Sequence, residues 1–136
     1  MKEISPAEQN WNSATSLYIA RKLQNLAQHH SHSTRILDMG CGDGSMIKRL
    51  HRYGYELYGY DFNGIELRAN LEPLYDELFE ERIHVMTDER VIPFGDNMFD
   101  VVYANQVWEH VKFLDRMVEE CARVLKPGGT LVTLFP

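Results

Sequence analysis

Cysteine is scarce in this sequence, and long apolar runs are absent. Cys41 and Cys121 are the only two cysteines among the 136 residues, and neither their number nor their spacing suits a disulfide framework or a zinc site. No stretch approaches the roughly 20 apolar residues that a membrane-spanning helix needs, and the amino-terminal residues lack the apolar core of a signal peptide. We therefore expect reduced thiols, no metal site, no membrane contact and a cytoplasmic location.

Positive charge is also in short supply. The 14 Lys and Arg residues face 20 Asp and Glu, which gives a formal net charge of −6 and a pI near 5.5. A nucleic-acid-binding protein needs a basic surface to meet phosphates, so we expect no nucleic-acid partner and favour a small or neutral one. The length suits a single domain, and a hydrophobic content of 44% is ordinary for a globular protein.

A short apolar run, a glycine-rich loop and a helical pattern follow one another in residues 35–50, RILDMGCGDGSMIKRL. The apolar residues of 36–39 predict a strand, and those of 46–50 share one face of a predicted helix. Between them Gly40, Gly42 and Gly44 carry no Cβ atom, which permits a sharp turn and the close approach of a ligand. We expect a binding site at the carboxyl end of this strand.

The spacing of these glycines differs from that of a dinucleotide-binding loop. That loop is usually G-x-G-x-x-G, whereas here the pattern is G-x-G-x-G and Ser45 takes the last place. With Asp38 in the strand before it, the segment LDMGCGDG resembles motif I of the class I S-adenosylmethionine (SAM)-dependent methyltransferases. For this segment alone, a glycine-rich turn without a ligand is the alternative.

Acidic residues also follow the next two predicted strands, residues 55–60 and 82–86. Asp61 comes about twenty residues after the glycine loop, where a carboxylate can accept hydrogen bonds from both ribose hydroxyls of an adenosine. Nicotinamide enzymes share this placement, and capping of the next helix is the alternative role. Phe62 is suited to lie against adenine. Asp88 and Glu89 follow the third strand, where a carboxylate can accept a hydrogen bond from the adenine amino group.

Residues 91–111, VIPFGDNMFDVVYANQVWEHV, resemble a segment of the small-molecule methyltransferases called type 11, P-F-x-D-x-x-F-D-x-V followed by E-H. The residues themselves predict a turn at 95–97 and a buried parallel strand at 100–104. Amphipathic spacing predicts a helix over 114–125, stopped by KPGG at 126–129, and a fifth strand at 130–135. The segment RVLKPGGTL again resembles that family.

The remaining regions are less informative. A capping-box pattern at 5–8 predicts a leading helix that ends at about residue 28. Its Trp11 and Tyr18 either cover a cofactor or pack on the sheet. The histidines of 29–32 lie in a polar linker, where we expect no metal. Residues 63–78 form a helical region interrupted by Pro73.

The resemblance extends from residue 34 to the end of the sequence and implies an α/β fold. This fold has a Rossmann-like parallel sheet in the order 3-2-1-4-5 with helices on both faces, without the C-terminal strands of the full methyltransferase fold. We expect one SAM-binding domain, residues 1–136, made of a leading helix and linker (1–33) and a Rossmann-like core (34–136). The edge of the fifth strand predicts a homodimer, or a longer protein that covers this edge.

The same resemblance implies the roles of individual residues. Asp38 would meet the amino group of SAM through water, Gly40 and its neighbours the methionine part, and Asn105 with Gln106 the methionyl end. His110 follows the fourth strand and could act as a general base; packing or capping of the helix is its alternative role. The full set of expected cofactor-binding residues is Asp38, Gly40, Cys41, Gly42, Gly44, Asp61, Phe62, Asp88, Glu89, Asn105 and Gln106.

The implied function is methyl transfer from SAM to a small-molecule acceptor. Because SAM carries the difficult chemistry, the protein has mainly to align donor and acceptor and to exclude water. Two other functions remain open: a non-catalytic SAM-binding or partner-binding protein of the same fold, and a fragment of an NAD-dependent oxidoreductase. The glycine spacing and the 91–111 segment argue against the oxidoreductase.

Overall fold

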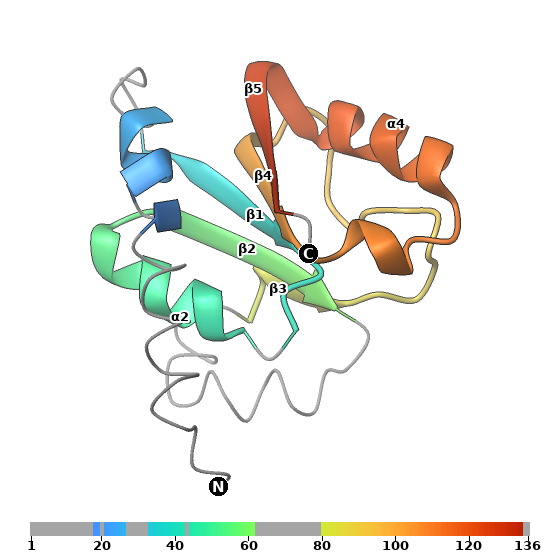
Figure 1. Cartoon of the computed structure of the whole chain (residues 1–136), viewed down its shortest axis with the longest axis horizontal. Coiled ribbons are helices and arrows are strands. Elements are labelled where there is room, and N and C mark those ends of the chain that lie inside the picture. Colours follow the sequence, from blue (N-terminus) through green and yellow to red (C-terminus); the bar gives the residue numbers. More distant parts are fainter. Residues whose placement is uncertain (1–17, 20, 27–32, 43, 62–79, 135–136) are drawn as a thin grey trace, which may run out of the picture. The chain divides into compact units, whose positions relative to one another are not determined.

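The computed structural model describes residues 18–19, 21–26, 33–42, 44–61 and 80–134. Contacts within the chain divide it into two units, Met1–His32 and Ser33–Pro136. In the first unit, residues 18–19 and 21–26 are helical. The second unit contains the sheet described below (Figure 1). A single domain over residues 1–136 stays a prediction.

Five strands form one parallel sheet in the second unit. Their order is β3-β2-β1-β4-β5, and each neighbouring pair is parallel, which confirms the predicted order (Figure 1). The carboxyl ends of parallel strands meet at one edge, and the chain order reverses between β1 and β4, where open α/β sheets bind ligands. The strands are β1 (Arg35–Met39), β2 (Glu56–Asp61), β3 (Ile83–Val85), β4 (Phe99–Asn105) and β5 (Leu125–Leu134).

One face of the sheet packs against helix α4 (Leu114–Val124). Side chains alternate between the two faces of a strand, and Leu37 and Met39 of β1 lie in one buried cluster with Met117 and Cys121 of α4. Burial of the Cys121 thiol raises its pKa to about 11, so it is protonated near neutral pH. The helix therefore covers this face with apolar side chains and a neutral thiol.

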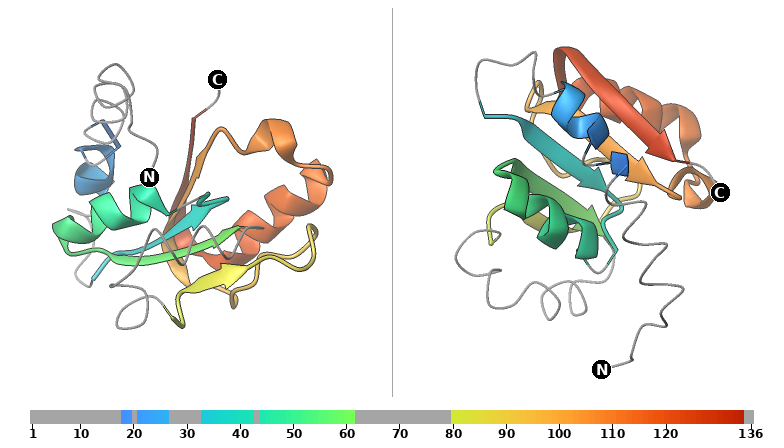
Figure 2. Two further views of the ribbon diagram at one scale, coloured as in Figure 1. Left: turned by 90° about the horizontal axis from the view of Figure 1, so that it is seen from below. Right: turned by 60° about the vertical axis from the view of Figure 1, so that its left-hand side comes forward.

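The opposite face packs against helix α2 (Ser45–Leu50). A Cβ atom added at Gly59 of β2 would lie 2.6 Å from Ile47 Cδ1 of α2, so the missing side chain lets the helix approach the strand. Figure 2 shows α2 and α4 on opposite sides of the sheet. The predicted helices on both faces are confirmed.

The fifth strand differs from its prediction. It begins at Leu125, directly after α4, and Leu125 pairs with Phe99 before the register shifts and Val101 pairs with Thr130. Gly128 has φ +80°, and a Cβ at Gly129 would lie 2.9 Å from the Lys126 carbonyl oxygen. Residues 126–129 thus form an irregularity inside the strand rather than a linker before it, because glycine permits this backbone path.

On its other side, β5 pairs with no strand among the described residues. Leu131 is 36% exposed there. Self-association through this edge, or cover by a longer chain, stays a prediction.

Some sequence interpretations fall outside the described residues. These are the roles of Trp11 and Phe62, the histidines of 29–32 and the helical region 63–78. Within the described part of the chain, no helix is long and apolar enough to cross a membrane. The same described residues contain no group of three or more His, Cys, Asp or Glu side chains that could hold a metal ion.

Candidate functional site

The loop between β1 and α2 turns with three glycines in the left-handed region. Their φ angles are +67° at Gly40, +58° at Gly42 and +79° at Gly44, which is the N-cap of α2. Residues with a Cβ atom rarely adopt these angles. A Cβ at Gly40 would also lie 2.9 Å from Val107 Cγ2. The glycines therefore bring the loop after β1 against the loop after β4.

The end of β2 holds the same loop from the other side. The Cys41 N–H donates to the Tyr60 carbonyl oxygen at 3.0 Å, and the Gly42 N–H donates to Asp61 Oδ2 at 2.6 Å. The carboxylate of Asp61 therefore faces the glycine loop across the carboxyl ends of two adjacent strands. This is the placement expected for a carboxylate that accepts hydrogen bonds from a ribose.

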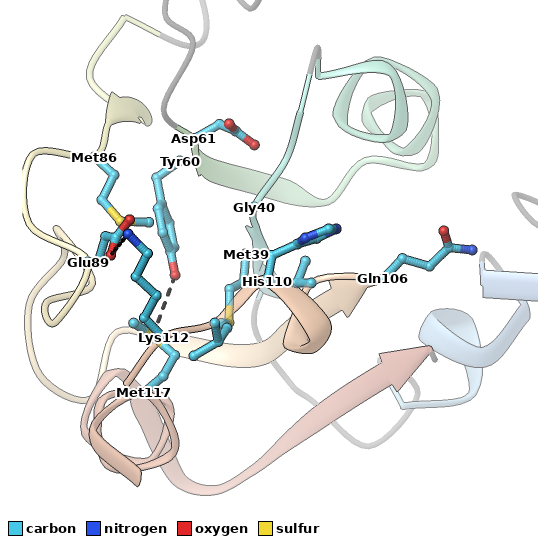
Figure 3. Close-up of a pocket in the computed structure, with 12 residues that line it drawn as sticks. Met39, Gly40, Tyr60, Asp61, Met86, Glu89, Gln106, His110, Lys112 and Met117 are labelled. Carbon is cyan, nitrogen blue, oxygen red and sulfur yellow. Dashed lines mark hydrogen bonds and ion pairs between the residues drawn. The ribbon is translucent and has the colours of Figure 1, made fainter. Parts of the chain in front are cut away.

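A cavity of about 250 Å³ opens beside this carboxylate. Burial raises the pKa of Tyr60, and its neutral hydroxyl donates to Met117 Sδ at 3.9 Å. In Figure 3, Glu89 and Lys112 lie side by side at the cavity, with Gln106 away from them. Most of the described residues that line the cavity are therefore apolar, and few of them are charged. The lining residues are Met39, Gly40, Tyr60, Asp61, Met86, Glu89, Gln106, Val107, His110, Val111, Lys112 and Met117.

His110 ends a short 3₁₀ helix, η3 (Trp108–His110), at this cavity. Its side chain is 81% exposed, and its Nε2 lies 3.8 Å from Glu109 Oε1. Lys112 Nζ lies 3.6 Å from Glu89 Oε2, so this ion pair joins the segment after η3 to the segment after β3. The imidazole is therefore accessible to a bound molecule and is not enclosed by the protein.

Five residues of the sequence-predicted set line the cavity together: Gly40, Asp61, Glu89, Gln106 and His110. Gly42 reaches the site through its N–H on Asp61. Gly44 is the N-cap of α2, and Cys41 is a buried residue of the loop itself. Asp38 is buried in β1, and Asn105 ends β4.

The carboxylate of Asp88 is hydrogen-bonded within its own loop. Its Oδ1 accepts the Arg90 N–H at 2.9 Å and the Arg90 Nε–H at 3.1 Å. These hydrogen bonds and the charge of Arg90 lower the pKa of the Asp88 carboxyl. Glu89, rather than Asp88, faces the cavity, so the structure separates two neighbouring acids that the sequence had grouped.

The sequence interpretation missed the apolar lining. Met39, Met86 and Met117 come from three separate elements and line the same cavity. In the sequence each looks like an ordinary core residue, and hydrophobic periodicity cannot show which core residue borders a cavity. Lys112 was missed for a similar reason, since a single lysine after a turn carries no pattern.

Comparison with known proteins agrees with this arrangement. A family model described as "Methyltransferase domain" matches residues 37–133. The mitochondrial ubiquinone biosynthesis O-methyltransferase of Mus musculus is 34% identical over 116 residues, which cover 80% of this chain and 31% of that protein. The sterol 24-C-methyltransferase of Schizosaccharomyces pombe is 36% identical over 98 residues, which cover 71% of this chain and 26% of that protein.

A solved structure, that of the cyclase SpnF, has the same fold with a TM-score of 0.63 and 27% identity. The match covers 84% of this chain and 43% of that one. The chain therefore spans about a third or less of the two curated relatives and less than half of the solved protein.

Proposed function

The chain belongs to the class I SAM-dependent methyltransferase family, and on this premise we propose that it binds SAM and transfers a methyl group to a small-molecule acceptor. Membership of this family removes the oxidoreductase alternative. The two curated relatives are named for methyl transfer in ubiquinone biosynthesis and to a sterol, to oxygen in one case and to carbon in the other. Both names support a small organic acceptor for this chain.

The observation that carries the proposal is the pairing of Asp61 with the glycine loop. Asp61 Oδ2 already accepts the Gly42 N–H, and both Asp61 and Gly40 border the cavity. A nucleoside has hydroxyls that need acceptors and a base that needs apolar walls. The carboxylate and the Met86 and Val107 side chains supply these two environments at one site. The residues present therefore fit the nucleoside part of SAM.

SAM, when bound, supplies a methyl group on a sulfonium, which is electrophilic without help from the protein. The chain's residues would act by positioning. Gly40 borders the cavity, Asp61 would hold the ribose, and the apolar lining would keep water away from the transfer. His110 could accept a proton from an acceptor hydroxyl or acidic carbon, since it lies at the cavity and is accessible.

Calorimetry with SAM, S-adenosylhomocysteine and NAD tests the binding part of this proposal. We expect both SAM-type ligands to bind more tightly than NAD, because the loop lacks the G-x-G-x-x-G spacing. Tighter binding of NAD would overturn the proposal. For transfer, His110→Ala is expected to lower turnover about 10²-fold or more with little change in cofactor affinity if His110 is the base.

A second candidate is a SAM-binding protein that does not transfer methyl groups. Two observations favour it: the imidazole of His110, the histidine among the described residues that line the cavity, is largely exposed, and a solved relative is named as a cyclase. SAM binding without methyl transfer to any of a panel of phenols, sterols and amines would select this candidate.

A further inference from the structure

An ion pair at the rim of the cavity joins two segments that are distant in the sequence. Lys112 Nζ lies 3.6 Å from Glu89 Oε2, and both residues line the cavity. In Figure 3 the Lys112 side chain extends from the segment after η3 to the Glu89 carboxylate. The two side chains are 71% and 36% exposed, so water reaches the pair and weakens it.

Two further side-chain contacts join the same segments. Arg116 Nε donates to the Arg90 carbonyl oxygen at 3.2 Å, and the Arg90 guanidinium carbon lies 5.9 Å from the centre of the Phe113 ring. The Arg90 and Arg116 side chains are both exposed, and exposed contacts of this kind contribute little to stability. The segments 88–90 and 112–116 are therefore joined by weak contacts.

The turns on either side of the ion pair have backbone hydrogen bonds of their own. The Val91 N–H donates to the Asp88 carbonyl oxygen at 3.2 Å, and the Val111 N–H donates to the Trp108 carbonyl oxygen at 3.2 Å. These hydrogen bonds lie within each turn and not between the two turns. The two segments can therefore separate without unfolding, as ligand-binding loops of low local stability do.

The size of the cavity gives such a separation a use. Ligand pockets commonly have volumes of about 300–1,000 Å³, whereas this cavity measures about 250 Å³. The proposed reaction requires SAM and an acceptor in the site together. The cavity therefore has to widen, and the weakly joined segments are the part of its rim that can move.

We propose that the Glu89–Lys112 ion pair is a gate, which narrows the entrance to the cavity when it is formed and admits ligands when it is broken. The gate sets the rates at which a ligand enters and leaves. It stabilises the closed entrance equally with and without ligand, so it does not change affinity. This inference rests on the proposed SAM binding, and it adds a role for Lys112, which has none in the proposed reaction.

The test measures how fast S-adenosylhomocysteine binds and leaves, with surface plasmon resonance giving both rate constants. Lys112→Met removes the charge and keeps a side chain of similar length. We expect both rate constants to rise about two- to fivefold, as for the loss of an exposed ion pair, with Kd unchanged. Because S-adenosylhomocysteine carries no net charge near neutral pH, added salt should raise both rates in the unsubstituted protein by screening the pair, with little effect on Lys112→Met.

Reversing the charges separates a gate from a direct contact with the ligand. The double variant Glu89→Lys with Lys112→Glu restores opposite charges and should return both rate constants to their original values. The matched control is Glu119→Gln. Glu119 Oε2 lies 3.5 Å from Arg116 in another exposed ion pair, and Glu119 does not line the cavity, so this variant should keep the original rates.

Two results would overturn the gate although SAM binding stands. One is unchanged rate constants in Lys112→Met, and the other is a change in Kd that the double variant does not reverse. If the unsubstituted protein does not bind S-adenosylhomocysteine, the proposed function itself fails, and the gate fails with it.

Discussion

Two segments of this chain resemble methyltransferase motifs, yet the structure uses them differently. The glycine loop with Asp61 presents backbone and carboxylate groups at the cavity. By contrast, the polar groups of the 92–100 segment bind to other parts of the protein. Arg123 of α4 donates to the carbonyl oxygens of Ile92 and Phe94, both at 2.9 Å, and to Asp96 Oδ1 at 2.8 Å.

Buried charge completes this second region. Glu120 has a side chain only 3% exposed, and its Oε2 lies 2.6 Å from Arg123 and 3.1 Å from the Ile92 nitrogen. Asp100 Oδ2 accepts the Arg35 N–H at 2.9 Å and lies 3.4 Å from Lys126 Nζ. We name the Glu120–Arg123–Asp96 set the clasp. It fixes the path of the chain into β4. The difference teaches that one family-like segment can divide its roles: residues 92–100 hold the fold together, whereas Gln106 and His110 of the same 91–111 segment line the cavity.

The largest expected effect on stability comes from removing the ion pairs of the clasp. Arg123→Ala leaves the buried Glu120 carboxylate without its nearest partner and should lower the free energy of unfolding by about 3–5 kcal/mol. Arg116→Ala removes another partner of Glu120, at 3.2 Å, but its side chain is 50% exposed, so a loss below about 1 kcal/mol is expected. Urea denaturation of the two variants measures this contrast, and equal losses would contradict the clasp.

Replacing Asp61, the carboxylate beside the cavity, should change ligand affinity instead of the free energy of unfolding. Asp61→Ala is expected to reduce S-adenosylhomocysteine affinity by about 1.5–3 kcal/mol, roughly ten- to a hundredfold, because a charged acceptor is lost. The control is Asp96→Ala, an exposed acid of the clasp, which should leave affinity unchanged. Calorimetry that finds unchanged affinity in folded Asp61→Ala would remove Asp61 from the site.

Each of the two regions contains one glycine that can be replaced by alanine, so the same substitution can be compared between them. Gly42 and Gly128 have φ of +58° and +80°, and no atom of the described residues lies within 4 Å of a Cβ added at either. Alanine at either position should lower stability by about 1–2 kcal/mol through backbone strain alone. Only Gly42→Ala is expected to weaken S-adenosylhomocysteine as well. If both variants bind it like the unsubstituted protein, then the loop backbone does not approach the ligand.

The smallest effect is a pH dependence of the clasp. Burial pushes the pKa of Glu120 up, but the hydrogen bonds and charge of Arg123, with the Ile92 N–H and Arg116, outweigh it and hold the pKa below its usual value. A depressed pKa stabilises the fold above the unfolded value of about 4.3, and this contribution is lost as pH falls through the folded value. The stability difference between the unsubstituted protein and Glu120→Gln should therefore shrink below about pH 4. A difference that stays constant from pH 7 to pH 3 would contradict this.

The sequence predicted the fold well because its signals are local. Alternation, glycine punctuation and amphipathic spacing located the five strands to within a few residues, except at β5. There Leu125 joins the sheet before the glycines, because its pairing with Phe99 involves residues 26 positions apart. No local pattern encodes that contact.

The site was predicted in part for the same reason. The glycine loop and Asp61 could be found from the sequence, because positive φ angles and an acid after a strand leave a recognisable pattern. The assignment of the glycine loop and Asp61 to SAM binding stays a prediction. The same holds for the SAM-binding roles of Cys41, Phe62 and Asn105. The separation of Glu89 from Asp88 and the methionine lining depend on contacts between distant segments.

The sequence by itself determined which elements form and that their carboxyl ends meet at one edge, since strand direction and glycine conformation are properties of short segments. Only the tertiary structure decided which motif residues face the cavity, which ones the clasp binds, and that Lys112 pairs with Glu89. These outcomes depend on partners tens of residues away in the sequence. The Asp100 carboxylate accepts a hydrogen bond from the Arg35 N–H, and the Arg123 guanidinium donates one to the Phe94 carbonyl oxygen. A buried polar group takes whichever partner the packed fold brings within hydrogen-bond distance.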